Sequence, residues 1–332
     1  MTRIRKLISL LLVIMLAMTP LFTSTAFAAN EGEISANCIA HPSGEIAYKH
    51  VVALSDDIGQ RVAGTEGERE AKVYIYKQFK KAGLKPTTQE FSFTSDDGQD
   101  HTSANVIAVK PGKSSKVVIV GGHYDSVPVG QGADDNASGI AVILEAAEVL
   151  KEVETPYTIK FIAFGAEEVG LKGSAYYVSQ MSKKDIKNTV AMINLDSLAV
   201  GDKMYVYGDE GKEGFVRDQA LKIAKRLNLE LETNPGLNAD YPAGTTGLWS
   251  DHAPFVEQGI PYGYFEATNW ELGDLDGYTQ TELDGEIWHT EKDTISYIDE
   301  NYPDRIKGHL STFSQVLSGL LKSMDKNRSP KN

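Results

Sequence analysis

Hydrophobic and polar residues alternate along this chain with two periods, one typical of helices and one typical of strands. Apolar positions recur at helical spacing between Gly44 and Gly59, and again from about Glu66 until Gly83 and Pro86 end the pattern. Shorter apolar or alternating runs predict strands at 87–94, 104–112, 116–126, 157–164, 188–197 and 260–267. Further helices are expected over 137–153, 171–183, 214–230 and 302–322. This alternation predicts an α/β fold, with a mainly parallel central sheet and helices on both faces.

The N-terminal segment does not continue this pattern. Three basic residues precede a short apolar run, and small residues follow it, with Ala26 and Ala28 in an A-x-A arrangement. This order is typical of a secretory signal peptide, so we expect residues 1–28 to be removed and the protein to be secreted. The apolar run is short for a membrane span, which disfavours the alternative of an uncleaved anchor.

Composition and charge limit the classes of partner. The 332 residues are 41% hydrophobic and 24% charged, which is ordinary for a globular domain. A formal net charge of −13 disfavours nucleic acid or an anionic membrane as the main partner. Cys38 is the only cysteine, so it has no partner for an internal disulfide. Residues 29–332 contain no repeat or linker, and we expect them to form a single domain and the protein to be a monomer.

Carboxylates and histidines recur where predicted strands end, which is where α/β sheets carry their sites. They are His123 and Asp125, Asp134 and Asp135 in "GADDNASG", Glu167 and Glu168 in "FGAEEVG", Asp196 in "MINLDS" and His289 in "EIWHTEKDT". Two histidines with several carboxylates and no cysteine suit a pair of zinc ions. Adjacent glutamates in extended chain point opposite ways, so one could bind metal while the other faces the metal-bound water. Each motif alone has a structural explanation, but their recurrence at successive strand ends favours a metal centre.

Taken in order, these motifs resemble those of a known family. "GGHYDS", "GADDNASG", "AFGAEEVGLKGS", "MINLDS", "SDHAPF" and "WHTEKDT" are similar to motifs of the secreted co-catalytic di-zinc aminopeptidases, the leucyl-aminopeptidase type made by vibrios and streptomycetes. The resemblance runs from about Arg61 to Thr294. It implies the zinc-dependent exopeptidase fold, which is phosphorylase/hydrolase-like, and makes residues 29–332 one zinc-peptidase catalytic domain.

The resemblance also implies a role for each matched residue. The expected metal ligands are His123 and Asp196 for one zinc ion, Glu168 and His289 for the other, and Asp135 as a bridge between them. Glu167 would be the general base that activates a water bridging the two ions, and Asp125 would orient His123 through its second ring nitrogen. A strained, possibly cis, peptide bond is implied between Asp135 and Asn136. The substrates would be the N-termini of peptides and proteins.

Three points stay open at this stage. Trp288 stands where the family commonly has a tyrosine, so the oxyanion donor other than zinc is unassigned. Asp251 and His252 in "SDHAPF" either approach the site or fix a loop. The acidic segment Asn269–Asp293 is a solvated loop, a calcium site or, with Glu266, a selector of basic N-terminal residues.

Other functions fit the same scaffold. A dipeptidase or a carboxypeptidase would share the metal site, so pocket geometry or an assay has to separate them. Glutaminyl cyclases resemble the family but use a single zinc ion, and the intact His123 and Asp135 favour two metals and hydrolysis. A non-catalytic binding module would lack a ligand or the base, and none of these positions is missing.

Overall fold

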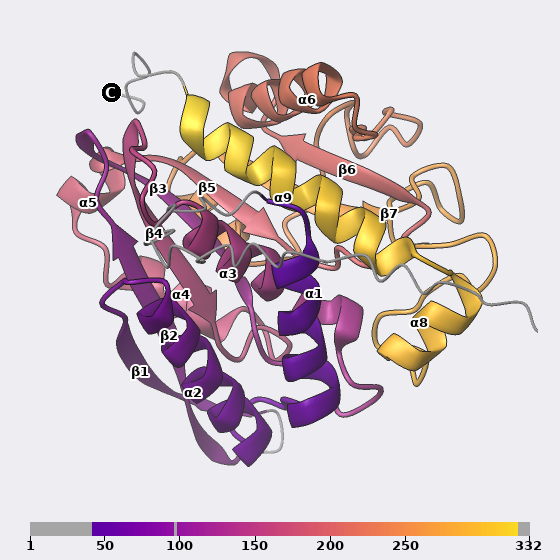
Figure 1. The fold of residues 1–332 in the computed structure, drawn as a ribbon, viewed down its shortest axis with the longest axis horizontal. Coiled ribbons are helices and arrows are strands. Elements are labelled where there is room, and N and C mark those ends of the chain that lie inside the picture. The colour runs from indigo at the N-terminus through magenta and orange to yellow at the C-terminus, as the bar shows by residue number, and fades with distance from the viewer. Residues whose placement is uncertain (1–41, 96–97, 325–332) are drawn as a thin grey trace, which may run out of the picture. The chain divides into compact units, whose positions relative to one another are not determined.

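The computed structural model describes residues 42–95 and 98–324, in which helices cover both faces of a seven-stranded sheet (Figure 1). The expected signal peptide, residues 1–28, and Cys38 lie outside the described residues. None of the helices in the described ranges is long and apolar enough to cross a membrane.

The sheet is parallel in its centre and antiparallel towards both edges. Its strands are β1 (Thr87–Thr94), β2 (Asp100–Lys110), β3 (Ser114–His123), β4 (Tyr157–Phe164), β5 (Thr189–Leu195), β6 (Lys203–Gly208) and β7 (Tyr262–Thr268). They lie in the order β1-β2-β4-β3-β5-β7-β6. The neighbours β4, β3, β5 and β7 are parallel, whereas β1–β2, β2–β4 and β6–β7 are antiparallel. The predicted α/β fold with a mainly parallel central sheet is confirmed, and β6 is a strand that the pattern did not predict.

The helices form two layers. They are α1 (Glu45–Val52), α2 (Glu66–Lys81), α3 (Gly139–Val149), α4 (Lys172–Ser179), α5 (Lys183–Asn188), α6 (Phe215–Leu227), α7 (Ala253–Glu257), α8 (Ile295–Asn301) and α9 (Arg305–Ser323). Helices α1, α2, α3, α6 and α9 pack on the larger core cluster (Figure 1), and α4, α5 and α7 pack on a second cluster. The short helices α5, α7 and α8 were not predicted.

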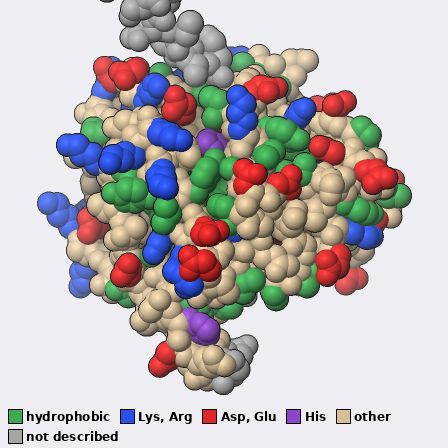
Figure 2. Space-filling model, turned by 60° about the horizontal axis from the view of Figure 1, so that its bottom comes forward, with side chains coloured by type: hydrophobic (Ala, Val, Ile, Leu, Met, Phe, Trp, Pro, Cys, Tyr) green, Lys and Arg blue, Asp and Glu red, His purple; other side chains and the backbone are tan. Residues whose placement is uncertain are grey.

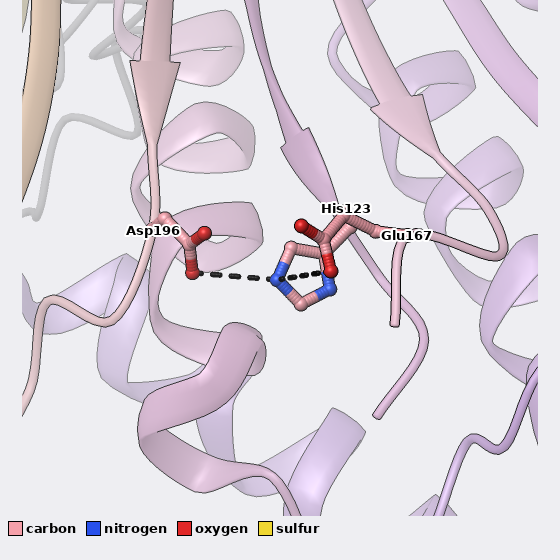
Figure 3. A group of neighbouring side chains, drawn as sticks. All are labelled: His123, Glu167 and Asp196. Atoms are coloured by element: carbon pink, nitrogen blue, oxygen red, sulfur yellow. Dashed lines mark hydrogen bonds and ion pairs between the residues drawn. The ribbon is translucent and has the colours of Figure 1, made fainter. Parts of the chain in front are cut away.

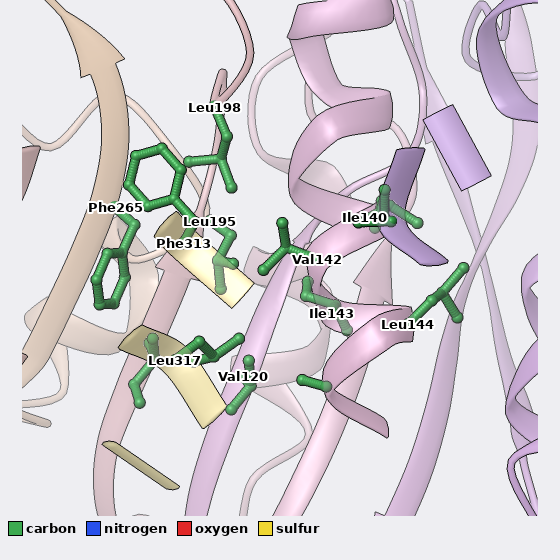
Figure 4. Close-up of a cluster of buried hydrophobic side chains, with 14 of the residues drawn as sticks. Val120, Ile140, Val142, Ile143, Leu144, Leu195, Leu198, Phe265, Phe313 and Leu317 are labelled. Atoms are coloured by element: carbon green, nitrogen blue, oxygen red, sulfur yellow. The ribbon is translucent and has the colours of Figure 1, made fainter. Parts of the chain in front are cut away.

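Alternate residues of the central strands face the two layers, so these strands are buried on both sides. In β5, Ile193 and Leu195 belong to the larger cluster, while Met192 belongs to the second. Figure 4 shows Leu195 and Val120 of the sheet beside side chains of α3 and α9. Each such side chain contributes about 1.5–3 kcal/mol when fully buried. This core holds the carboxyl ends of the strands at fixed positions, which matters for the residues that follow them.

A buried carboxylate joins the first described helix to the rest of the domain. The side chain of Glu145 in α3 accepts hydrogen bonds from the backbone N–H groups of Ser43 (2.8 Å), Gly44 (3.0 Å) and Ala47 (2.9 Å). It also accepts one from the hydroxyl of Ser314 in α9, at 3.1 Å. The first N–H groups of a helix have no partner inside the helix. Glu145 therefore caps α1, whose own preceding residue is a glycine.

The charge on the surface is not uniform. Figure 2 shows one face of the protein, where lysine and arginine side chains gather on one side of the view and acidic side chains predominate on the other. Basic and acidic side chains both lie among exposed hydrophobic side chains on this face.

Glu145→Gln is expected to lower the free energy of unfolding by about 2 kcal/mol, because an amide offers one acceptor oxygen and turns its NH2 group towards N–H donors. Urea unfolding of the metal-loaded protein measures the change. The control is Glu148→Gln on the same helix, a partly exposed residue that pairs with Lys151. It should change the free energy by less than about 0.5 kcal/mol. Equal stability of the two variants would contradict the capping role.

Candidate metal centre

The structure brings six of the predicted site residues to the wall of one cavity at the carboxyl edge of the sheet. They are His123, Asp135, Glu167, Glu168, Asp196 and His289. His123 ends β3, Glu167 follows β4 and Asp196 follows β5, so three neighbouring parallel strands each deliver one side chain. Figure 3 shows the imidazole of His123 between the carboxylates of Asp196 and Glu167.

Asp135 lies between the two histidines. Its Oδ1 is 3.1 Å from Nε2 of His123, and its Oδ2 is 3.1 Å from Nε2 of His289. One carboxylate thus presents a separate oxygen to each imidazole. This is the arrangement expected of a residue that bridges two adjacent cation sites.

Each histidine has a further carboxylate beside it. Asp196 Oδ1 is 3.3 Å from His123 Nε2, and Glu168 Oε2 is 3.0 Å from His289 Nε2. Among the described residues, two groups offer ligand atoms within 4.8 Å of one another: His123 with Glu167 and Asp196, and His123 with Asp135 and Glu168. Glu167 is the most distant of these carboxylates, because its Oε2 is 4.0 Å from His123 Nε2. The shorter contacts pair His123 with Asp196 and His289 with Glu168. This division gives two sets of ligands that share Asp135.

The donor set fits zinc. Imidazole nitrogens and carboxylate oxygens are ligands that this metal prefers. Glu168 Oε1 is buried and has no hydrogen-bond partner in the described part of the chain, so one lone-pair oxygen is left for a cation. Hydrogen bonds to Asp135 and Glu168 raise the pKa of His289 to about 11, and burial raises the pKa of Glu168 to about 7. Bound cations would offset both the burial of Glu168 and the negative charge around His289.

The backbone around Asp135 follows from close packing against β5. Asn136 Nδ2 donates to the backbone oxygen of Leu195 at 3.0 Å, and its Oδ1 accepts from the N–H of Gly139 at 2.9 Å. A Cβ atom at Gly139 would lie 2.4 Å from the Leu195 oxygen, so only glycine permits this approach. The peptide bond between Asp135 and Asn136 is cis, as the family resemblance implied.

Asp125 holds the turn that carries the two glutamates. Its carboxylate accepts from the N–H groups of Glu167 (3.0 Å) and Glu168 (3.1 Å). Its Oδ1 lies 3.6 Å from Nδ1 of His123, which is longer than a hydrogen bond, whereas its backbone oxygen lies 3.2 Å from that nitrogen. The backbone of Asp125 thus contacts the second ring nitrogen of His123, where the side chain was expected to do so. The side chain of Asp125 instead holds the N–H groups of the two glutamates, a role that the sequence did not predict.

The glutamates do not lie in extended chain, so that part of the sequence interpretation is wrong. Glu167 begins a tight turn, because its backbone oxygen accepts from the N–H groups of Gly170 (2.8 Å) and Leu171 (2.7 Å). The preceding Ala166 has a φ of 55°, and its N–H donates to the buried carboxylate of Glu68 at 3.1 Å. The carboxylates of Asp125 and Glu68 therefore hold the backbone of this turn.

Asp293 and Asp134 hold the bridging residue, and the sequence analysis assigned neither of them a role. The carboxylate of Asp293 accepts from the N–H groups of Asp134 (2.6 Å) and Asp135 (3.1 Å). Asp134 Oδ1 in turn accepts from the N–H groups of Ala199 (2.6 Å) and Val200 (3.2 Å), just beyond Asp196. The loop of the bridging aspartate is therefore tied to the loop of a second ligand.

Gln280 connects this network of hydrogen bonds to the loop that carries His289. Its Nε2 donates to Asp134 Oδ2 at 2.6 Å, and its Oε1 accepts from the N–H groups of Ile287 and Trp288, both at 2.8 Å. His289 is the next residue. The position of His289 thus depends on the amide side chain of Gln280, and no motif in the neighbouring sequence predicts this role.

Of the two residues left open in "SDHAPF", Asp251 is completely buried near the site, where its charge adds to the burial that raises the pKa of Glu167. His252 fixes the loop, and the neighbouring Ser250 contacts a candidate ligand. Ser250 donates its hydroxyl proton to Asp196 Oδ2 at 2.6 Å. His252 stacks on Tyr262 and Tyr264 with centroids 4.9 Å apart in both cases, and its Nε2 contacts the backbone oxygen of Gly247 at 3.0 Å. Burial lowers the pKa of His252 to about 4, so it is a neutral packing residue.

Two carboxylates of the acidic segment Asn269–Asp293 form ion pairs with lysines of the protein. Asp284 forms an ion pair with Lys292 at 2.8 Å, and Glu271 forms one with Lys203 at 2.8 Å. Within residues 42–95 and 98–324, the groups of side chains that could hold a metal lie at the strand ends and not in this segment. The calcium site stays a prediction without structural support.

The cavity beside these ligands has a volume of about 360 Å³. Apart from the six residues above, its wall contains Gly170, Leu171, Ser197, Trp249, Tyr264, Glu266, Gly277, Tyr278 and Trp288. Aromatic rings therefore form much of its lining. The indole N–H of Trp288 is buried and has no acceptor in the described part of the chain.

Comparison with known protein sequences identifies relatives. The model of peptidase family M28 matches residues 105–314. An alkaline phosphatase isozyme conversion protein of Escherichia coli is 36% identical over 315 residues, which cover 85% of this chain and 91% of that protein. The aminopeptidase YwaD of Bacillus subtilis is 37% identical over 206 residues, covering 60% of this chain and 41% of the relative. The chain thus spans nearly all of one relative and less than half of the other.

Solved structures share the fold. BSAP, a zinc aminopeptidase from Bacillus subtilis, superimposes with a TM-score of 0.69 at 22% identity, covering 84% of this chain and 94% of that one. A glutaminyl cyclase from Porphyromonas gingivalis gives 0.67 at 22% identity, covering 84% and 97%. At 22% identity these similarities establish the fold only. The reaction has to be inferred from the residues of the site.

Gln280→Leu is expected to weaken zinc binding about 10- to 100-fold, because the loop of His289 loses its tie to Asp134 while the ligands stay intact. Titration against a chelator of known affinity measures this change. Gln315→Leu is the control, since that side chain bonds only within α9 among the described residues. Equal zinc affinity of the two variants would show that Gln280 does not position the ligand.

Proposed function

This chain belongs to peptidase family M28, and we propose that it is a secreted di-zinc aminopeptidase that hydrolyses the N-terminal residue from peptides. The observation that carries the proposal is the position of Asp135, with one oxygen towards each of two histidines. A site built in this way suits two metal ions better than one. The N-terminal residues that predict export support secretion.

The residues that would hold the metals are those with the short contacts. His123 and Asp196 would bind one zinc ion, and the other would lie between Glu168 and His289. Asp135 would contact both. When bound, the ions would supply Lewis-acid polarisation of the peptide carbonyl and would acidify the attacking water.

Glu167 would move the proton. Its carboxylate faces the cavity and has no hydrogen-bond partner among the described residues, so it is available to a water molecule. Burial raises the pKa of Glu167 well above its usual range, which suits a group that accepts a proton and gives it back. It would take a proton from the attacking water and donate it to the nitrogen of the leaving peptide.

The charge around the cavity favours chain ends over internal bonds. The carboxylates of the cavity wall attract the positively charged N-terminus of a peptide, and an acetylated N-terminus lacks that charge. The name of the Escherichia coli relative describes the conversion of one enzyme form into another. Removal of terminal residues is one limited change of that kind.

The first test combines metal content with a pair of substrates. Purified protein should contain two zinc ions per chain and should release nitroaniline from Leu-p-nitroanilide but not from its N-acetylated form. One zinc ion, with cyclisation of N-terminal glutamine and no hydrolysis, would favour a glutaminyl cyclase. Cleavage of free dipeptides only, or of C-terminal residues, would keep the metal chemistry and overturn the aminopeptidase assignment.

Glu167→Gln is expected to keep both zinc ions and to lower kcat by about 10²- to 10⁴-fold, because an amide does not accept the proton of the attacking water. Initial-rate assays with Leu-p-nitroanilide measure kcat, and metal analysis of the same sample measures the zinc content. Glu257→Gln, at an exposed residue in α7, is the control for the loss of one charge. Near-normal turnover of Glu167→Gln with its metals in place would remove Glu167 from this role.

A further inference from the structure

The cavity wall contains a carboxylate that neither the metals nor the proton transfer requires. Five acidic residues line the cavity, and four of them are Asp135, Asp196, Glu167 and Glu168. The fifth is Glu266 in β7, whose side chain is almost completely buried, with 2% of the residue exposed. A carboxylate is costly in such a position unless it has partners or a cation.

Two tyrosine hydroxyls contact this carboxylate. Tyr207 donates to Oε2 and Tyr264 donates to Oε1, both at 2.8 Å. The hydroxyl of Tyr207 accepts from the indole N–H of Trp270 at 2.6 Å, which leaves its own proton for Glu266. These bonds hold the carboxylate in one orientation, with lone pairs to spare on both oxygens.

Glu266 has no cationic partner. It forms no ion pair within residues 42–95 and 98–324, and the cavity lining includes no lysine or arginine. Burial raises the pKa of Glu266 to about 8, and the two tyrosine bonds only partly offset that rise. A positive charge brought into the cavity would lower the free energy of the ionised form.

The rest of the cavity suits the stem and the face of an organic cation. Tyr264 lies beside Glu266 in the wall, while Trp249 and Tyr278 are 41% and 52% exposed at the same cavity. Aromatic faces attract ammonium and guanidinium groups and pack against their methylene chains. A volume of about 360 Å³ is large enough for an extended lysine or arginine side chain.

We propose that this cavity selects peptides whose N-terminal residue is arginine or lysine, and that Glu266 is the counter-ion of that side chain. The inference rests on the proposed aminopeptidase function and names its substrate class. It also distinguishes Glu266 from the acids of the segment Asn269–Asp293, two of which, Glu271 and Asp284, form ion pairs with lysines.

The test compares substrates that differ in charge and little in shape. The p-nitroanilides of arginine and citrulline form one such pair, and those of lysine and norleucine form another. The wild-type protein should show a kcat/KM for arginine at least about tenfold above that for citrulline. Glu266→Gln keeps an acceptor for one tyrosine and removes the charge, so it should lower this ratio about tenfold.

The control removes a charge of the same sign elsewhere. Glu286→Gln, an exposed residue of the acidic segment, should leave the arginine-to-citrulline ratio unchanged. Zinc content of every variant is measured alongside, and inhibition by argininamide relative to citrullinamide gives a readout of binding that does not depend on turnover.

The outcomes separate the two proposals. Hydrolysis of the neutral substrates with no preference for arginine or lysine in the wild-type protein would overturn the role of Glu266 and keep the aminopeptidase. A preference that falls equally in Glu286→Gln would assign selection to the acidic surface and overturn the inference as well. Absence of hydrolysis with every free-amine substrate would overturn the proposed function itself. A wild-type ratio near one overturns the inference even where Glu266→Gln fails to fold.

Discussion

The structure depends on one constraint, which is the burial of many carboxylates at a single edge of the sheet. Asp125, Asp134 and Asp293 are buried beside the candidate ligands Asp135 and Asp196. Like charges at this spacing repel strongly in a medium of low polarity. The surrounding loops place backbone N–H groups against Asp125, Asp134 and Asp293.

Backbone N–H groups meet most of this need, and in doing so they define the geometry of the site. Asp293 accepts from the N–H groups of the bridging aspartate and the residue before it, Asp125 accepts from those of both glutamates, and Asp134 accepts from two that follow Asp196. Arg61, a fully buried guanidinium nearby, donates instead to backbone oxygens such as those of Tyr124 and Gly132. The groups that stabilise the charge are therefore also the groups that locate the ligands.

Periodicity located the central strands because each is a long apolar run with a polar residue at its end. His123 and Asp196 could be singled out for that reason, and the family match confirmed the resemblance that their motifs carried. The narrower likeness to vibrio and streptomycete enzymes stays a prediction. Gln280 carried no signal, because its partner Asp134 lies 146 residues away and only the folded chain joins them. Strand β6 was missed because six residues give too short a pattern, and the turn at Ala166 was missed because distant carboxylates impose it.

The cap on α1 also constrains the order in which the chain can fold. Glu145 joins α1 to α3 and α9 through contacts that span 102 and 169 residues, and Tyr48 in α1 reaches Asp299 across 251 residues. Contacts of such long range form late, since the loop they close must first be ordered. All segments that build the cavity lie between these helices, and the packing of α1 is complete only after the polypeptide up to α9 has emerged. A nascent chain in which synthesis stopped before α9 would therefore display to chaperones and proteases the apolar surface of α1 and α3 that α9 covers.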